Sequence, residues 1–284
     1  MQNRRTFLAC STAALSRPAA AASDRIRFAV IGAGNRGGYV AGVFGGFSDV
    51  ECVAVCDVYK PNREQVAAKL PGKPEAVADY RRVLDRKDID AVLIATPDHW
   101  HGPMVMEACR AGKDAYCEKP VTHSIETGLR MIEAVRKHKR VVQIGLQQRS
   151  WQHFQENAER VQKGMFGTIY QAQCVYQGNY LRPPEAPSEP PPDLDWNLFQ
   201  GPAERRRYTR SRRRMWRSFY DYSGGTLLDW GVHLTHVAHW YLNAKAPLLA
   251  GGAGQYVRYP CPDRDQLPDS VACNWVYDKF VMTY

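Results

Sequence analysis

Strand-like and helix-like patterns of hydrophobic residues alternate through the first half of the chain. Short apolar runs typical of buried strands occur at residues 27–31, 50–55, 91–95, 113–117 and 141–145. Segments between them, including 38–44, 103–111 and 122–139, have the length and spacing of helices. Strands that alternate with helices are typical of a parallel sheet covered on both faces. The pattern predicts a doubly wound α/β domain, a Rossmann fold, that ends near residue 146.

The pattern changes after residue 146. A helix is expected at about 150–163, a strand at 168–177 and a helix from Gly224 to about Leu242. Residues 182–192 contain six prolines in eleven positions, which indicates an extended surface loop that 196–202 continues. Single domains commonly have roughly 100 to 200 residues. We therefore expect two domains, residues 25–146 and 147–284.

Composition and charge exclude several classes of protein. Hydrophobic residues make up 44% and charged residues 24%, close to globular averages, which excludes disordered, collagen-like and coiled-coil chains. No apolar run reaches the roughly 18 residues needed to span a bilayer. The net charge of +9 comes from residues 1–22, which contribute +3, and residues 204–217, which contribute +7. This clustering argues against nucleic-acid binding and favours a solvated Arg-rich loop, with a site for an acidic substrate or partner as the alternative.

The first 22 residues have the features of an export signal. Residues 3–8 read Asn-Arg-Arg-Thr-Phe-Leu, a twin-arginine pattern, and residues 20–22 offer an Ala-x-Ala cleavage site. This predicts a twin-arginine signal peptide, the twin-arginine export machinery as a partner, and a periplasmic or extracytoplasmic location. Without a functional leader, the protein would be cytoplasmic. The eight cysteines form no Cys-x-x-Cys pair and are expected to be core thiols.

A glycine-rich turn follows the first predicted strand. Gly32, Gly34 and Gly37 form Gly-x-Gly-x-x-Gly between a strand and a helix. The first glycine permits a tight turn, the second lets the backbone approach a pyrophosphate, and the third allows close packing of helix and strand. The helix N-terminus then faces the phosphates. The turn, with Asn35 and Arg36 inside it, predicts a dinucleotide site.

An acidic residue follows the second strand at the distance expected for this site. Asp57 lies twenty residues beyond Gly37, where its carboxylate can accept hydrogen bonds from the adenosine ribose. A carboxylate there repels a 2′-phosphate, which favours NAD over NADP. Lys60 and Arg63 follow closely, so NADP stays open.

Polar residues also follow the next two strands. Thr96, Pro97 and His101 come after residues 91–95, and Glu118 and Lys119 come after residues 113–117. Ligands of open α/β sheets bind outside the carboxyl ends of the strands. These side chains are therefore expected beside the same crevice.

One face of the helix expected after Gly224 is polar. Asp229, His233, His236 and Trp240 are spaced i, i+4, i+7 and i+11. Polar side chains that satisfy one another inside the domain would give the same pattern. The polar face is therefore either a functional site or a structural feature. A metal site is a third interpretation, which we disfavour because no further ligand cluster is evident in the sequence.

Together these motifs resemble the Gfo/Idh/MocA family, named for glucose-fructose oxidoreductase, inositol dehydrogenase and a rhizopine catabolism protein. The resemblance extends from residue 25 to the end and rests on four ordered motifs: Gly32-x-Gly34-x-x-Gly37, Thr96-Pro97-x-x-x-His101, Glu118-Lys119-Pro120 and Gly224-Gly225-x-x-x-Asp229-x-x-x-His233. It implies an N-terminal Rossmann domain and a C-terminal α+β domain with a mostly antiparallel sheet. It also implies a homo-oligomer, a dimer or tetramer.

The resemblance implies roles for individual residues. Lys119 matches the family's active-site lysine, near the nicotinamide and the reacting carbon, and Asp229 and His233 match its Asp-His pair. Oxidation of a secondary alcohol needs a base for the hydroxyl proton, and His233 is the candidate. Lys119 would stabilise the developing alkoxide, and Asp229 would orient the imidazole or a sugar hydroxyl. The substrate-contact candidates are Arg149, His236 and Trp240.

The sequence thus predicts an NAD(P)-dependent oxidoreductase that acts on a secondary hydroxyl of a sugar, cyclitol or glycoside with a tightly bound cofactor. An NAD-dependent glycosidase that oxidises its substrate transiently and a non-catalytic cofactor-loaded protein are the alternatives. Only about four strand-like runs follow residue 146, fewer than the family's sheet contains. We therefore expect the C-terminal domain to be incomplete.

Overall fold

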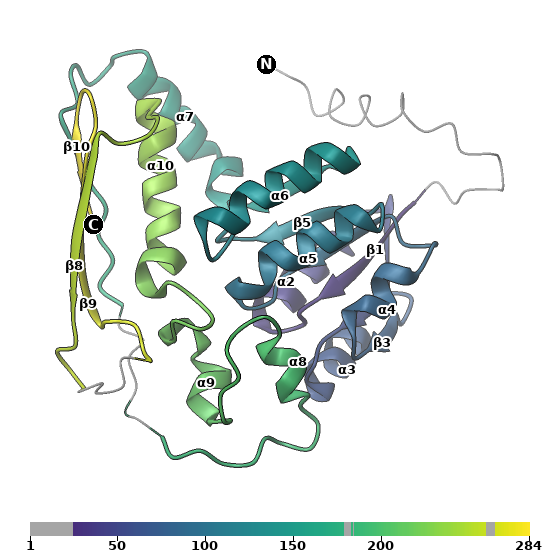
Figure 1. Ribbon diagram of the computed structural model, residues 1–284. Helices are drawn as coiled ribbons and strands as arrows, with labels where there is room; N and C mark the ends of the chain where they lie inside the picture. The colour runs from purple at the N-terminus through teal and green to yellow at the C-terminus, as the bar shows by residue number, and fades with distance from the viewer. Residues whose placement is uncertain (1–24, 179–182, 184, 260–264) are drawn as a thin grey trace.

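A computed structural model describes residues 25–178, 183, 185–259 and 265–284 of the chain (Figure 1). The predicted leader, residues 1–22, lies outside the described residues. Within them, none of the helices has both the length and the apolar character needed to cross a membrane. The described cysteines are free thiols, and all but the half-buried Cys273 are buried, as expected.

The first domain is built on a parallel six-stranded sheet with the order β3-β2-β1-β4-β5-β6. Helices cover both of its faces, and each face has its own apolar core. The doubly wound prediction is confirmed. Its strands are β1 Ile26–Ile31, β2 Val50–Cys56, β3 Glu75–Val77, β4 Ala91–Ile94, β5 Asp114–Glu118 and β6 Val142–Gly145; its helices are α2 Asn35–Phe44, α3 Lys60–Lys69, α4 Tyr80–Asp85, α5 Asp98–Arg110 and α6 Ile125–His138.

The second half combines helices with a smaller mixed sheet of order β7-β10-β9-β8. β7 and β10 are parallel and the other two pairs are antiparallel. Figure 1 shows α10 between this sheet and the Rossmann domain, and its apolar residues Leu234 and Ala238 pack against the core of the small sheet. The elements are η1 Gln147–Ser150, α7 Gln152–Gln162, β7 Gln171–Gln173, α8 Trp196–Gln200, α9 Arg210–Arg214, η2 Trp216–Ser218, η3 Leu227–Gly231, α10 Val232–Leu242, β8 Leu249–Gln255, β9 Ser270–Val276 and β10 Val281–Thr283.

Three sequence predictions of local structure were wrong. The helix expected from about residue 103 begins at Asp98, so α5 contains the polar motif after β4. The strand expected at 168–177 shrinks to β7. Residues 196–200, expected as loop, form α8, because the Asp195 side chain caps the helix and Trp196 and Phe199 are buried in an aromatic cluster.

Candidate functional site

The glycine turn between β1 and α2 has the geometry that a dinucleotide site requires. Gly32 has a φ of +91°, and a Cβ there would lie 2.7 Å from the main chain of Ala95. A Cβ at Gly37 would lie 1.9 Å from the Gly32 carbonyl oxygen, so helix and turn pack closely. A Cβ at Gly34 would meet nothing within 4 Å. The helix N-terminus has no side-chain cap and no acidic residue in its first turn, which leaves its amide groups for an anion.

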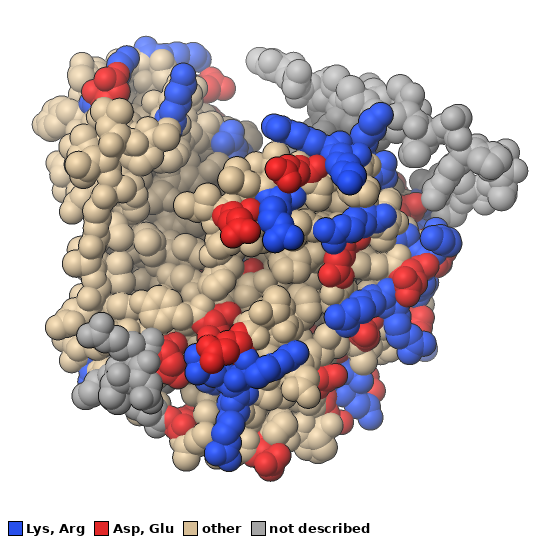
Figure 2. All heavy atoms as spheres, viewed as in Figure 1, with Lys and Arg blue, Asp and Glu red and all other residues tan. Residues whose placement is uncertain are grey.

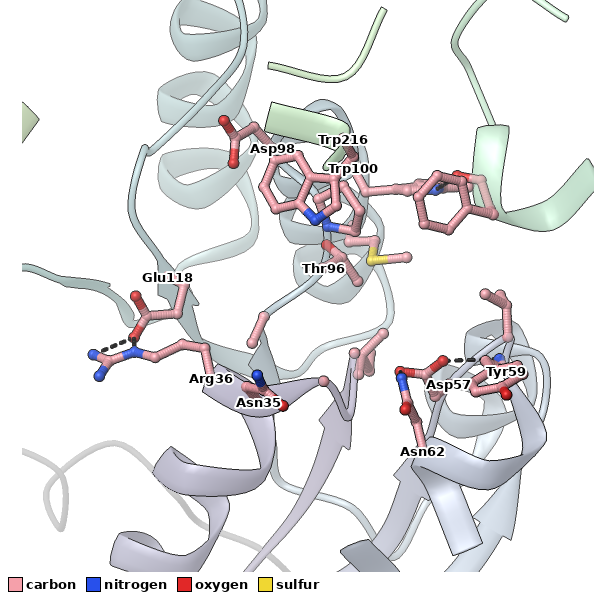
Figure 3. Close-up of a pocket in the computed structure, with 18 of the residues that line it drawn as sticks. Asn35, Arg36, Asp57, Tyr59, Asn62, Thr96, Asp98, Trp100, Glu118 and Trp216 are labelled. Atoms are coloured by element: carbon pink, nitrogen blue, oxygen red, sulfur yellow. Dashed lines mark hydrogen bonds and ion pairs between the residues drawn. The ribbon is translucent and has the colours of Figure 1, made fainter. Parts of the chain in front are cut away.

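Asp57 fixes the loop after β2 against the glycine turn. Its carboxylate accepts hydrogen bonds from the amides of Ala33 and Tyr59, each at 2.8 Å, and from the Asn62 side chain at 3.3 Å. Burial raises the pKa of Asp57, and these hydrogen bonds act in the opposite direction. Figure 3 shows Asp57, Tyr59 and Asn62 together at one end of the pocket.

A cavity of about 750 Å³ joins this turn to the second half of the chain. Figure 3 shows Asn35 and Asp57 on one side of it, with Trp100 and Trp216 on the opposite side. Eleven of the predicted site residues line the cavity: Gly32, Gly34, Asn35, Arg36, Asp57, Thr96, Pro97, Glu118, Lys119, Asp229 and His233. The remaining five, Gly37, His101, Arg149, His236 and Trp240, are not among its lining residues.

Lys119 and Asp229 form a buried ion pair inside the cavity. The Lys119 ammonium donates to Asp229 Oδ1 at 2.5 Å and to the Asp229 carbonyl oxygen at 2.7 Å. Arg217 Nε donates to the same carboxylate oxygen at 3.0 Å. Lys119 comes from the end of β5 and Asp229 from the segment before α10, so the pair also joins the two domains.

His233 lies next to this pair with only 6% of its surface exposed. Burial and the Lys119 cation lower the pKa of His233 to about 4, although the Asp229 carboxylate acts in the opposite direction. The imidazole is therefore neutral near pH 7 and can accept a proton. Its Nδ1 is buried without a hydrogen-bond partner in the described part of the chain. Asp229 was expected to orient the imidazole or a sugar hydroxyl; its carboxylate accepts hydrogen bonds from Lys119 and Arg217.

The polar face of α10 divides into two groups. Asp229 lies in a π-helical turn, Leu227–Gly231, that precedes α10, and such turns are frequent at functional sites. Further along the helix, Arg149 approaches His236 Nε2 at 3.4 Å and stacks at 4.5 Å over the ring of Trp240. The three candidate substrate contacts thus form a cluster of their own outside the cavity, because their side chains pair with one another.

Glu118 anchors Arg36, and both residues line the cavity. The Glu118 carboxylate accepts from Arg36 Nε at 2.8 Å and pairs with the terminal nitrogen at 2.7 Å (Figure 3). Tyr116 also donates to Glu118, at 3.3 Å. Gly145 in β6 makes room for the Tyr116 and Glu118 side chains, since a Cβ there would lie 2.7 Å from the Tyr116 hydroxyl.

His101 does not face the cavity, which corrects its prediction as a cofactor contact. Only 1% of its surface is exposed. Its Nδ1 bonds the Pro120 carbonyl at 2.7 Å and its Nε2 bonds the Thr96 carbonyl at 3.0 Å. Burial opposes its charge, but nearby Cys117 and Asp98 outweigh burial and raise the pKa of His101 to about 9. His101 therefore fixes the loops that carry Thr96 and Lys119.

Asp98, which was not among the predicted site residues, also lines the cavity. Its carboxylate is buried and accepts a hydrogen bond from the Ser223 hydroxyl at 2.7 Å. Burial raises the pKa of Asp98. Its position directly after Pro97 at a strand end was the available signal.

The Arg-rich stretch is a solvated loop only in part, which corrects the favoured interpretation: half of its arginines are exposed and half are partly or fully buried. Arg212 is buried and pairs at 2.7 Å with both Asp221 and Asp265. Arg213, Arg214 and Arg217 line the cavity. In the area of α9, Figure 2 shows basic side chains lying against acidic ones. The stretch contributes to the fold and to the site wall, which favours the alternative of an acidic ligand.

No cluster of three or more His, Cys, Asp or Glu side chains suited to a metal ion occurs within residues 25–178, 183, 185–259 and 265–284. What the site does fit is a dinucleotide. The open space above Gly34, the uncapped N-terminus of α2 and a cavity whose lining includes both Asp57 and His233 all match it.

Comparison with known proteins identifies the family. Residues 26–146 match the Gfo/Idh/MocA oxidoreductase family, NAD-binding Rossmann fold, and residues 166–248 match the C-terminal α/β domain of that family. The chain belongs to this family. Its N-terminal domain is therefore an NAD-binding Rossmann domain, and the expected fold class, with its mixed, mostly antiparallel second sheet, is confirmed.

Individual relatives agree with this assignment. The chain is 28% identical over 228 residues to the scyllo-inositol 2-dehydrogenase (NAD(+)) of Bacillus subtilis, covering 80% of this chain and 57% of that protein. It is 26% identical over 161 residues to a glycosyl hydrolase family 109 protein of Shewanella, covering 54% of this chain and 35% of that protein. The crystal structure of GenD2 from gentamicin A biosynthesis in complex with NAD superimposes with a TM-score of 0.69 at 17% identity, covering 95% of this chain and 67% of that one. The chain spans about half the length of the curated relatives it matches.

Proposed function

We propose that this protein oxidises a secondary hydroxyl of a sugar, cyclitol or glycoside and transfers the hydride to a tightly held NAD. The observation that carries the proposal is the placement of Lys119, Asp229 and His233 in one cavity with the glycine turn. A neutral imidazole and an ammonium group within one buried site suit removal of a hydroxyl proton and stabilisation of the resulting negative oxygen. Relatives named inositol 2-dehydrogenases support the substrate class.

The chain's own residues have separable roles in this chemistry. When bound, NAD supplies the acceptor for the hydride that leaves carbon. The hydroxyl proton passes to the His233 imidazole, and the Lys119 ammonium stabilises the negative charge that develops on oxygen. Asp229 and Arg217 hold Lys119 in place through their shared ion pair. Trp216 and Trp230 line the same cavity and offer apolar faces to a sugar ring.

The pH dependence follows from the lowered pKa of His233. The base is active when neutral, so activity should stay constant as the pH falls from 8 to 5 and decline only as it approaches about 4. The check is kcat/KM for substrate across this range at saturating NAD, with circular dichroism at each pH to exclude acid unfolding. A midpoint near the ordinary imidazole pKa of about 6.5 would contradict the buried, proton-accepting role.

The tightly held cofactor can be tested directly. We expect the purified, acid-denatured protein to release near-stoichiometric NAD or NADP, detected by mass spectrometry and absorbance. An empty protein that also fails to bind added NADH would overturn the proposal.

We further propose that the protein is exported by residues 1–22 and works as an oligomer. Retention in the cytoplasm of a variant carrying Arg4→Lys and Arg5→Lys, and a dimer or larger mass in light scattering, would support these two points.

A second candidate is a glycosidase that oxidises its substrate transiently on bound NAD. Relatives named glycosyl hydrolase family 109 proteins favour it. The two functions differ in product, because the glycosidase hydrolyses a glycosidic bond without net oxidation. Incubation of the NAD-loaded protein with inositols and with aryl glycosides, analysed by mass spectrometry, distinguishes a ketone product from a released aglycone.

A further inference from the structure

A segment from outside the Rossmann domain closes the Asp57 end of the cavity. This segment, residues 193–199, is called the strap below. The Lys60 amide donates to the Asp193 carbonyl at 2.9 Å, and the Asp195 amide donates to the Val58 carbonyl at 3.1 Å. The strap therefore pairs as a short strand with the loop that follows β2. In Figure 1, α8, which contains the end of the strap, lies beside α3.

The side chains of the strap form an apolar wall of the cavity. Leu194 forms an antiparallel bridge with Tyr59, and Leu194, Leu198 and Phe199 all line the cavity. Leu194 and Phe199 are buried. Because Asp57 marks the end where an adenosine ribose is expected, this wall lies where it can cover the adenosine half of a dinucleotide.

The far end of the strap is fixed to α5. Trp100 Nε1 donates to the Phe199 carbonyl at 3.0 Å, and His99 Nε2 lies 3.2 Å from the same oxygen. Gly201, with a φ of +52°, turns the chain directly over the Trp100 ring, which a Cβ would meet at 1.9 Å. The strap is thus attached at both ends to the Rossmann domain.

Arg213 completes this end of the cavity. Its guanidinium stacks 3.8 Å from the centre of the Tyr59 ring and lines the cavity. In the described part of the chain, no carboxylate forms an ion pair with Arg213. A planar guanidinium that stacks on Tyr59 and lies close enough to Asp57 to oppose the burial that raises the pKa of that carboxylate suits stacking on adenine and attraction to the dinucleotide phosphates.

We propose that the strap and Arg213 form a binding subsite for the adenosine half of the dinucleotide, contributed from outside the Rossmann domain, which must open before the cofactor can leave. The inference rests on the proposed function, since it presupposes NAD in this cavity. If the strap must open before release, the cofactor stays bound to the protein between turnovers. Each reduced cofactor must then be reoxidised on the same protein, by a second carbonyl substrate or by return of the hydride to the first.

The test measures NADH dissociation in stopped flow, by loading the protein with NADH and displacing it with excess NAD⁺. Arg213→Gln should accelerate dissociation about tenfold, the loss expected for one desolvated cation–π contact. Arg210→Gln is the matched control, because Arg210 is exposed at the start of α9 and does not line the cavity. It should leave the rate unchanged.

A reversible lock tests the opening itself. Tyr59 and Leu194 face each other across an antiparallel bridge, a geometry that accepts a disulfide. The double variant Tyr59→Cys and Leu194→Cys should release NADH at least about tenfold more slowly when oxidised than after reduction with dithiothreitol, since the closed bond blocks opening. Equal rates in both states, or no effect of Arg213→Gln, would overturn the proposed role of the strap. NADH binding itself would continue to support the proposed function. A wild-type chain that takes up no NADH would overturn the proposed function and the strap together.

Discussion

Replacement of Lys119 by methionine should abolish turnover while leaving NADH binding intact. Methionine keeps much of the length of lysine but cannot donate a hydrogen bond or carry charge. Loss of the cation next to the developing negative oxygen should lower kcat by about a thousandfold or more. Asp229 keeps Arg217 as a partner, so the fold should survive. Steady-state kinetics and NADH fluorescence titration on the same preparation measure both effects.

The control for this variant is Lys137→Met, which removes a lysine from the last turn of α6, away from the cavity. It should change neither kcat nor NADH binding. Unchanged turnover in Lys119→Met would eliminate the proposed active site. Loss of both turnover and NADH binding would instead assign Lys119 to cofactor binding alone.

The Rossmann domain could be predicted from the sequence because its signals are local. Each buried strand is a short apolar run, and each turn of the site lies directly after such a run, as with Gly32 after β1 and Lys119 after β5. Parallel strands then bring these turns to one edge of the sheet. Nine of the eleven predicted residues that line the cavity consequently come from this edge of the Rossmann sheet.

The rest of the site depends on contacts between distant parts of the chain. Arg217 was assigned to a solvated stretch because its partner, Asp229, lies twelve residues further along the chain. The two side chains meet only in the folded protein, where Arg217 belongs to η2, Trp216–Ser218. The strap was expected as loop, since prolines precede it and its pairing with residues 58–60 cannot be seen locally. The polar stripe on α10 divides because His236 and Trp240 at its far end contact Arg149, a pairing that the spacing along the helix does not reveal.

The same substitution at two glycines of one turn should differ in its effect on stability. Gly37→Ala would place a Cβ 1.9 Å from the Gly32 carbonyl oxygen, so α2 must move away from β1. Overpacking of this kind costs about 3 kcal/mol of unfolding free energy. A urea melt followed by circular dichroism should show the loss without added cofactor, and NADH binding should weaken with it.

Gly34→Ala should leave stability unchanged and weaken NADH binding instead. Gly34 has an ordinary φ of −68°, and a Cβ there meets no atom within 4 Å, so the apo fold accepts it. That open space is where the dinucleotide phosphates must approach the backbone. A methyl group there should raise the Kd for NADH at least about tenfold, which corresponds to roughly 1.4 kcal/mol. Normal NADH affinity in a stable Gly34→Ala protein would mean that the dinucleotide does not pass over this turn. A lower urea midpoint would mean that the turn is packed more tightly than the geometry at Gly34 indicates.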